Sequence, residues 1–455
     1  MHSESARQWV HIGSGLFALL LRVLVWWQAA ALAAFALVFN AVALPRIGGR
    51  RLYRPVDEAR GFPLGILLYP LSVLLLILIF PSRLDIVAAA WAILALGDGT
   101  ATLAGHAKAA RLGTNAQTAK LAKTGALPWN ADKTIAGTAA FIVCGGLGGV
   151  ALAWWVRPSI APLPAMTFTI VAPIAAAIAA GFVESIPIRL DDNVSVPATA
   201  AAVLWLASLM DTAAWHAARG VVVATVPFAL GVNAVAAWLG YRAGTVSRSG
   251  TVGGFFIGML IYLGAGGGAW LLLFTTFLTA SIASRLGLRR KMVLGIAEER
   301  GGRRGAGNAI ANCGVAATAA IAAVTTPHAP AALLALAAAL AAGGSDTVAS
   351  EIGKAWGRST FLVTSLGRVT PGTPGAMSLE GTAAGLTAAF GLAAVGVAAG
   401  LVPASAIVAI VVAATAGALV ESALAATLEG PGILNNDMLN FINTAVAAGV
   451  ALWIG

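Results

Sequence analysis

The feature that most constrains this chain is a series of long apolar stretches, separated by short segments rich in charge, proline or glycine. An apolar run of about 20 residues forms a helix that crosses a bilayer and satisfies its own backbone hydrogen bonds. The pattern therefore predicts about fifteen membrane spans. The predicted spans are Arg7 to Leu24, Trp26 to Leu44, Gly61 to Phe80, Leu84 to Leu103, Ile135 to Val156, Pro164 to Glu184, Val196 to Met210, Gly220 to Leu239, Gly250 to Leu263, Ala269 to Leu286, Asn308 to Val324, Ala329 to Gly344, Ser378 to Ala399, Pro403 to Ala425 and Leu439 to Ile454.

The composition indicates the same fold class. Of the 455 residues, 59% are hydrophobic and only 10% are charged, whereas soluble domains carry roughly 25% charged residues. We therefore expect an all-α, polytopic transmembrane protein and exclude a soluble globular one. The two cysteines, Cys144 and Cys313, lie far apart in apolar surroundings. Neither a disulfide framework nor a cysteine metal site is expected.

The positive charges predict how the chain is oriented. Its net charge is +10, and twenty of its 28 Lys and Arg lie in four stretches, Arg46 to Arg60, Lys108 to Lys133, Arg285 to Arg304 and Lys354 to Arg368. An even number of predicted spans separates each pair of stretches, so all four lie on one face. The positive-inside rule makes that face cytoplasmic, with the N-terminus inside and the C-terminus outside. The expected surroundings are a lipid bilayer, and no nucleic-acid partner is expected.

Ionisable residues within or at the ends of membrane helices are costly, so they are the default functional candidates. In this chain they occur twice in the same order. The first half has Gly97-Asp98, then Asp132-Lys133-Thr134 with Gly137-Thr138, then Glu184, then Asp191-Asp192-Asn193. The second half has Ser345-Asp346-Thr347 with Glu351, then Gly381-Thr382, then Glu421, then Asn435-Asn436-Asp437. We predict two parallel-oriented halves, 1–215 and 216–455, each with a site that opens to the cytoplasm.

Carboxylates that converge beside lysine and arginine suit an oxygen-ligated Mg²⁺ ion facing a polyphosphate. In phosphoryl transfer to an alcohol, a further carboxylate takes the hydroxyl proton, a role open to Asp98 or Asp192. The sequence has no Gly-x-x-x-x-Gly-Lys-Ser/Thr motif, so a P-loop enzyme is excluded. The glycine run Gly145 to Gly149 lies within an apolar stretch and predicts a close helix contact.

Both halves resemble known lipid kinases. The first resembles the dolichol kinase and phytol kinase family through Arg7 with His11-Ile12-Gly13, Leu96-Gly97-Asp98, Asp132-Lys133-Thr134 with Gly137-Thr138, and Glu184 with Asp192-Asn193. Its Lys-Thr-x-x-Gly-Thr element is shared with the CDP-diacylglycerol synthase superfamily. The second resembles the phytyl-phosphate kinase family through Asn308 and Asn312, Ser345 to Gly353, Gly372 to Ser378, Gly381-Thr382, and Glu421 through Asn435-Asn436-Asp437 to Asn440 and Asn443.

The resemblance implies a bifunctional enzyme. Its first half would phosphorylate an isoprenoid alcohol such as phytol, geranylgeraniol or farnesol, and its second half would convert the monophosphate to the diphosphate. Both would use Mg²⁺ and a nucleoside triphosphate, commonly CTP. The second half lacks a lysine at the place of Lys133, so Lys354, Arg358 or Arg368 is expected to contact phosphate there.

The acidic pattern and the resemblance together predict the site residues. Catalytic roles are predicted for Asp98, Lys133, Asp192, Asp346 and Glu351. Nucleotide or phosphate contacts are predicted for Gly97, Lys108, Thr134, Gly137, Thr138, Asn193, Asn312, Gly372, Thr373, Gly375, Ser378, Gly381, Thr382 and Asn436. The predicted metal ligands are Asp98, Glu184, Asp192, Asp346, Glu421 and Asp437.

Two other functions remain open at this stage. A CTP-dependent cytidylyltransferase of the CDP-diacylglycerol synthase type shares the Lys-Thr-x-x-Gly-Thr element, and it would release pyrophosphate in place of CDP. A lipid or small-molecule transporter would also have many helices, although transporter sites commonly lie near the bilayer midplane.

Overall fold

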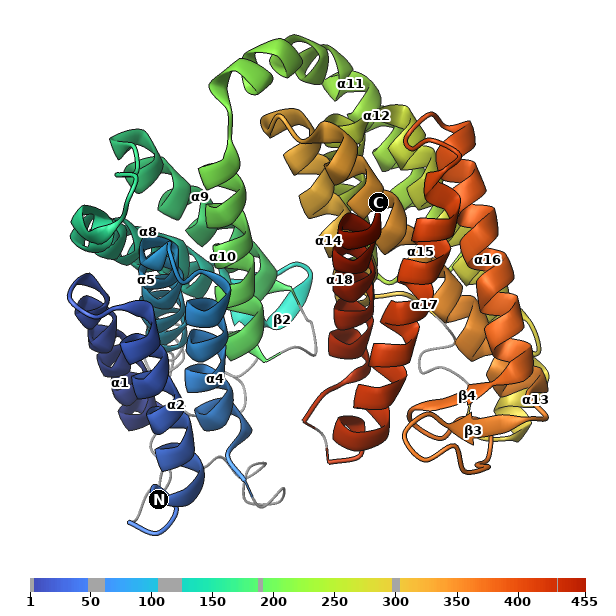
Figure 1. Ribbon diagram of the computed structural model, residues 1–455, viewed down its shortest axis with the longest axis horizontal. Helices are drawn as coiled ribbons and strands as arrows, with labels where there is room; N and C mark the ends of the chain where they lie inside the picture. The colour runs from blue at the N-terminus through green and yellow to red at the C-terminus, as the bar shows by residue number, and fades with distance from the viewer. Residues whose placement is uncertain (1–3, 48–61, 105–124, 187–190, 297–302, 432) are drawn as a thin grey trace. The chain divides into compact units, whose positions relative to one another are not determined.

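The computed structural model describes residues 4–47, 62–104, 125–186, 191–296, 303–431 and 433–455 (Figure 1). The chain divides into two compact units, Met1–Ser208 and Leu209–Gly455. Helices dominate both units, and the described strands form two short two-stranded sheets.

Unit 1 is built around α5, a helix whose alanine-rich residues are almost all buried. The elements of unit 1 are α1 (Glu4–Ser14), the 3₁₀ helix η1 (Gly15–Arg22), α2 (Trp26–Val42), α4 (Leu64–Ile79), α5 (Leu84–Ala92), the π-helix η3 (Ile93–Asp98), β1 (Ala126–Leu127), β2 (Asn130–Thr134), α8 (Ile135–Val156), the 3₁₀ helix η4 (Arg157–Ser159), α9 (Met166–Ser185) and α10 (Asp192–Leu209).

Glycines let α8 pack closely on its neighbours in unit 1. A β-carbon on Gly145 would lie 3.3 Å from Gly97 Cα, and one on Gly149 would lie 3.1 Å from the Pro173 ring. Small residues allow such close backbone approach between helices in a membrane. The predicted helix contact of this glycine run is therefore confirmed.

Unit 2 surrounds α15, which packs against α12, α14, α16, α17 and α18. The elements of unit 2 are α11 (Thr212–Arg242), α12 (Arg248–Arg285), α13 (Leu288–Val293), α14 (Ala306–Thr325), α15 (Ala329–Trp356), β3 (Thr360–Leu362), β4 (Ala376–Ser378), α16 (Leu379–Ala398), α17 (Ala406–Leu424), the π-helix η6 (Ala425–Glu429) and α18 (Asn436–Ile454).

Helix α12 is a hairpin of two helical segments. Gly266 breaks it with a φ of 78°, a conformation that favours glycine. Both ends of α12 reach the same residue, because Ser247 N donates to Arg304 O at 2.9 Å and an Arg304 Nη2 donates to Ser284 Oγ at 3.4 Å. The chain therefore reverses at Gly266, between the two predicted spans that end at Leu263 and begin at Ala269.

The predicted fold class is confirmed. Among the described residues, ten helices are long and apolar enough to cross a membrane, and α2 and α4 are shorter apolar helices. The count of about fifteen spans stays a prediction. Two predicted boundaries are wrong. Helix α11 begins at Thr212 and not at Gly220, and α15 continues from Gly344 to Trp356. The last turns of α15 carry polar side chains, which the prediction placed outside the span. These side chains line a polar cavity inside unit 2, so the helix can continue through them.

Candidate functional site

A short β-hairpin presents Lys133 at the start of α8 in unit 1. Strands β1 and β2 pair antiparallel, and Thr134 at the end of β2 caps α8 by accepting a 3.1 Å hydrogen bond from Gly137 N. Threonine is a favoured N-cap because its hydroxyl satisfies one of the unpaired amides of the first turn. A β-carbon on Gly137 would lie 3.1 Å from Ala101 O. The cap and this close approach fix Lys133 beside the helix that carries Asp98.

Three carboxylates converge around Lys133. One oxygen from each of Asp98, Glu184 and Asp192 lies within 4.8 Å of the others. Asp98 ends the π-helix η3, Glu184 is in the last turn of α9, and Asp192 begins α10. Lys133 Nζ donates to Glu184 Oε1, and to Asp192 Oδ2 at 3.2 Å. The structure thus brings together four residues from four different elements of unit 1.

The charges of this cluster suit a divalent cation. Lys133 and Asp192 lie outside the helices that qualify as spans. Burial acts to lower the pKa of Lys133, but the Asp192 and Glu184 carboxylates hold it above its usual value. Burial raises the pKa of Asp192 to about 7 against the attraction of Lys133, and the negative charges of Asp98 and Glu184 raise it further. One lysine does not offset three carboxylates.

Glu184 provides a second sign of a cation site. Its side chain is only 3% exposed, and its Oε2 has no hydrogen-bond partner among the described residues. A buried carboxylate oxygen without a donor is costly unless a cation pairs with it. Oxygen ligands of this kind are those that Mg²⁺ prefers. The donor set of Asp98, Glu184 and Asp192 therefore fits the predicted metal.

An apolar cavity adjoins the acidic cluster in unit 1. Its volume is about 620 Å³, and α1, η1, α2, α4 and α5 supply nearly all of its mainly hydrophobic lining. His11 and Asn193 also line it. His11 Nε2 lies 3.5 Å from Asp98 Oδ2, and Asn193 follows Asp192 in α10. The cavity thus ends beside the carboxylates.

Unit 2 repeats the local structure of the first site. Strands β3 and β4 pair antiparallel, and Ser378 caps α16 by accepting a 3.0 Å hydrogen bond from Gly381 N. A β-carbon on Gly381 would lie 2.5 Å from Ala349 O, three residues after Asp346, just as Ala101 is three residues after Asp98. The two units therefore share a hairpin, a capped helix and a glycine contact.

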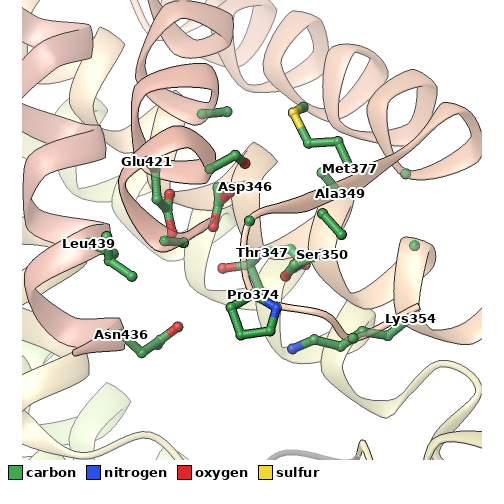
Figure 2. Close-up of a pocket in the computed structure, with 18 of the residues that line it drawn as sticks. Asp346, Thr347, Ala349, Ser350, Lys354, Pro374, Met377, Glu421, Asn436 and Leu439 are labelled. Atoms are coloured by element: carbon green, nitrogen blue, oxygen red, sulfur yellow. Dashed lines mark hydrogen bonds between the residues drawn. The ribbon is translucent and has the colours of Figure 1, made fainter. Parts of the chain in front are cut away.

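The residue before the cap distinguishes the two sites. Unit 1 has Lys133 at that position, whereas unit 2 has Met377. Figure 2 shows the carboxyl groups of Asp346 and Glu421 directed toward each other. The hairpin of unit 2 therefore supplies no lysine to pair with these two acids.

A polar cavity of about 240 Å³ surrounds this acidic pair. Helices α15, α16, α17 and α18 and the loop between β3 and β4 enclose it (Figure 2). Its lining contains ten predicted site residues, namely Asp346, Gly372, Thr373, Gly375, Ser378, Gly381, Thr382, Glu421, Asn436 and the phosphate candidate Lys354. The positive φ values of Gly372 and Gly375, 89° and 72°, explain why glycine occupies these turns of the loop.

Other predicted residues of unit 2 lie outside the polar cavity. Glu351 is 1% exposed and pairs with the buried Lys291, so its catalytic role stays a prediction. Asp437 lies in the first turn of α18 and does not line the cavity. Asn312 donates to Asn308 O at 2.9 Å and lines a neighbouring apolar cavity. The phosphate candidates Arg358 and Arg368 do not line the polar cavity either.

The remaining predicted residues of unit 1 have varied surroundings. Gly97 packs against the Phe141 ring. Asn193 donates its backbone N–H and its side-chain amide to Asp191 Oδ1. Thr138 Oγ1 is buried without a hydrogen-bond partner in the described part of the chain. Lys108 lies outside the described residues.

Two residues beside the sites were absent from the predicted set. His11 belongs to the first-half motif, but it is 87 residues from Asp98, so their contact could not be predicted from the sequence. Arg304 lines the polar cavity of unit 2, and it belongs to a stretch of cations that predicted only the orientation of the chain.

Comparisons with known proteins place unit 2 in a family. The model of DUF92, a family of integral membrane proteins, matches residues 231–448. An uncharacterised membrane protein of Synechocystis sp. is 38% identical over 201 residues, which are 44% of this chain and 78% of that protein. This chain belongs to the DUF92 family.

Two further relatives extend the comparison. The chloroplastic protein VTE6 of Arabidopsis thaliana is 36% identical over 214 residues, 46% of this chain and 64% of VTE6. An uncharacterised membrane protein of Methanocaldococcus jannaschii is 30% identical over 209 residues, 46% of this chain and 85% of that protein. No solved structure matches the chain. The DUF92 match lies within unit 2, so the dolichol kinase and CDP-diacylglycerol synthase resemblances of unit 1 stay predictions.

Proposed function

We propose that this DUF92 protein is a bifunctional isoprenoid kinase. Unit 1 phosphorylates a prenol such as phytol, geranylgeraniol or farnesol, and unit 2 phosphorylates the resulting monophosphate. Both reactions use Mg²⁺ and a nucleoside triphosphate, with CTP the expected donor. Both sites open to the cytoplasmic face, as the distribution of cationic loops predicts.

One observation carries this proposal: each unit places an acidic polar site next to an apolar cavity. In unit 1 the apolar cavity reaches Asp98 through His11. In unit 2 the polar cavity shares Arg304 and Asn308 with an apolar cavity of about 140 Å³. A substrate with a polar head and a long apolar tail matches both arrangements, because its two parts need opposite surroundings.

The residues of unit 1 support transfer to an alcohol. Glu184 and Asp192 would hold Mg²⁺, which neutralises charge on the transferred phosphoryl group. Asp98, at the end of the apolar cavity, accepts the proton of the prenol hydroxyl as its oxygen attacks the γ-phosphorus. The bond from that phosphorus to the bridging oxygen breaks, and the nucleoside diphosphate leaves. Lys133 attracts the phosphate charge.

In unit 2 the acceptor is already a phosphate. Asp346 and Glu421 would hold Mg²⁺, and Lys354, which lies about two turns beyond Asp346 on α15, supplies positive charge to the nucleotide phosphates (Figure 2). The acceptor needs no base, because a phosphate oxygen is ionised at neutral pH. Unit 2 has Met377 where unit 1 has Lys133, so no lysine charge at this position competes with a metal ion for the two acids.

Product analysis tests the proposal. Purified protein is incubated with Mg²⁺, CTP or ATP, and a panel of prenols and prenyl monophosphates, and the products are identified by mass spectrometry. We expect prenyl monophosphate, prenyl diphosphate and the nucleoside diphosphate. Pyrophosphate with a CDP-linked lipid would establish the cytidylyltransferase alternative. No new product, together with movement of lipid across proteoliposome membranes, would favour a transporter.

A further inference from the structure

The polar and apolar cavities of unit 2 meet at Arg304. This residue and Asn308 line both the polar cavity, which holds Asp346 and Glu421, and the apolar cavity between α11, α12 and α14. Most of the other residues that line the apolar cavity are alanine, glycine, phenylalanine and leucine. Arg304 therefore holds a fixed positive charge where a polar head and an apolar tail would join.

Several contacts hold Arg304 in this place. Its backbone N–H donates to Thr245 O at 2.9 Å, and its carbonyl accepts from Ser247 N at 2.9 Å. Its guanidinium donates to Asn308 Oδ1 at 3.1 Å and to Ser284 Oγ at 3.4 Å. These bonds anchor the side chain between α12 and α14, with its orientation set before a ligand binds.

The corresponding junction in unit 1 has a different character. His11 and Asn193 stand where the apolar cavity meets the carboxylates, and the described residues that line this cavity include no lysine or arginine. A neutral hydroxyl suits such a junction. The two units thus differ in charge at the point where the acceptor head group would lie.

We propose that Arg304 binds the phosphate of the prenyl monophosphate acceptor and restricts unit 2 to phosphorylated acceptors. This inference rests on the proposed function and adds the group that recognises the acceptor. The guanidinium presents paired donors whose geometry matches phosphate oxygens. A phosphate oxygen of the acceptor then attacks the γ-phosphorus, the bond to the bridging oxygen breaks, and the nucleoside diphosphate leaves. A prenol carries no negative charge and would gain none of these charge-assisted hydrogen bonds from Arg304.

The test compares Arg304→Gln with Arg303→Gln. Arg303 is the exposed neighbour of Arg304 and lines neither cavity, so its variant controls for the loss of one positive charge. KM for farnesyl monophosphate is measured at saturating nucleotide, and KM for nucleotide at saturating farnesyl monophosphate. We expect Arg304→Gln to raise the acceptor KM by roughly 10- to 100-fold, the effect of losing charge-assisted hydrogen bonds. The nucleotide KM should change less than about 3-fold, and Arg303→Gln should match wild type within the same margin.

Binding without nucleotide gives a second readout. Farnesyl monophosphate should raise the thermal stability of wild type and of Arg303→Gln but not that of Arg304→Gln. If Arg304→Gln does not fold, Arg304→Lys serves instead, because it keeps the charge, loses the paired donors and should show a smaller rise in acceptor KM.

The outcomes separate the two proposals. An unchanged acceptor KM and unchanged farnesyl monophosphate binding in Arg304→Gln would overturn the role of Arg304 while leaving the kinase intact. If the nucleotide KM rose as much as the acceptor KM, Arg304 would contact the nucleotide, and the proposed role in acceptor binding would be overturned as well. A wild-type protein that neither binds nor phosphorylates farnesyl monophosphate would overturn the proposed function of unit 2 itself.

Discussion

Replacing Lys133 by methionine removes the cation at the centre of unit 1 and reproduces the residue found at the matching position of unit 2, Met377. Lys133 contacts Glu184 directly and lies 3.2 Å from Asp192 Oδ2. The variant leaves three carboxylates within 4.8 Å of one another. We expect the metal-free protein to lose stability and Mg²⁺ to restore most of it, because the ion supplies the positive charge that the lysine provided.

The size of the effect follows from the geometry. Opposite charges 3.2 Å apart attract by about 5 kcal/mol at an effective dielectric of about 20, and removing one partner of a buried pair costs about 3–5 kcal/mol. Lys133 is 30% exposed, and the carboxylates can take up protons in its absence, which reduces the cost. We expect a loss of about 2–3 kcal/mol, or about 5–10 °C in the Tm of a unit of this size.

The assay is thermal unfolding in detergent, in EDTA and in saturating Mg²⁺. The loss in Lys133→Met should be at least halved by Mg²⁺, whereas the control Asp132→Asn, at an exposed neighbouring position, should match wild type in both conditions. Prenol phosphorylation should fall by about 100-fold or more in Lys133→Met. If Lys133→Met lost equal thermal stability with and without Mg²⁺, or lost none in EDTA, the idea that Mg²⁺ can replace the positive charge of Lys133 would be refuted.

Three further predictions concern the acids and the orientation of the chain. Glu421→Gln should lower turnover of prenyl monophosphate by about 100-fold or more, with partial recovery at raised Mg²⁺; kinetics and thermal unfolding measured together decide this, and a loss of stability with normal turnover would contradict it. Because burial raises the pKa of Asp192 to about 7, the folded protein binds that proton more tightly than the unfolded chain, so metal-free stability should fall as pH rises from about 4 to about 7. Unfolding of Asp192→Asn across this range should show a shallower fall, and an unchanged slope would exclude Asp192 as its source. In a background without Cys144 and Cys313, Arg358→Cys should be labelled from the cytoplasmic side and His328→Cys from the other, since they flank opposite ends of α15; labelling of both from one side would contradict the orientation.

The sequence was sufficient to predict where the apolar helices lie and in which order the polar groups follow one another. Each predicted span overlaps a described helix, because the hydropathy of a membrane helix is encoded locally. The repeated order of acid, capped helix and second acid also corresponds to matching elements in both units. These features depend on neighbouring residues and on spacing, which the sequence contains directly.

Features that depend on tertiary contacts were not predicted. The two hairpins have strands of two to five residues, which are too short to show an alternating pattern of polar and apolar residues in the sequence. Glu351 was predicted to be catalytic from the acidic pattern and from its place in the Ser345 to Gly353 motif. The five-residue step from Asp346 to Glu351 turns an α-helix by about 140° beyond a full turn, and the structure accordingly directs Glu351 to Lys291, which is 60 residues away. The apolar cavities arise from packing between helices and have no linear signature.

The measurement that tests the central claim most directly is a comparison of Asp98→Asn with Asp346→Asn, each supplied with farnesol, Mg²⁺ and labelled nucleotide, and separately with farnesyl monophosphate. We predict that Asp98→Asn forms no product from farnesol but converts farnesyl monophosphate to the diphosphate. Asp346→Asn should convert farnesol to the monophosphate and stop there. Loss of both reactions in either folded variant would contradict two separate sites, one in each unit of the chain.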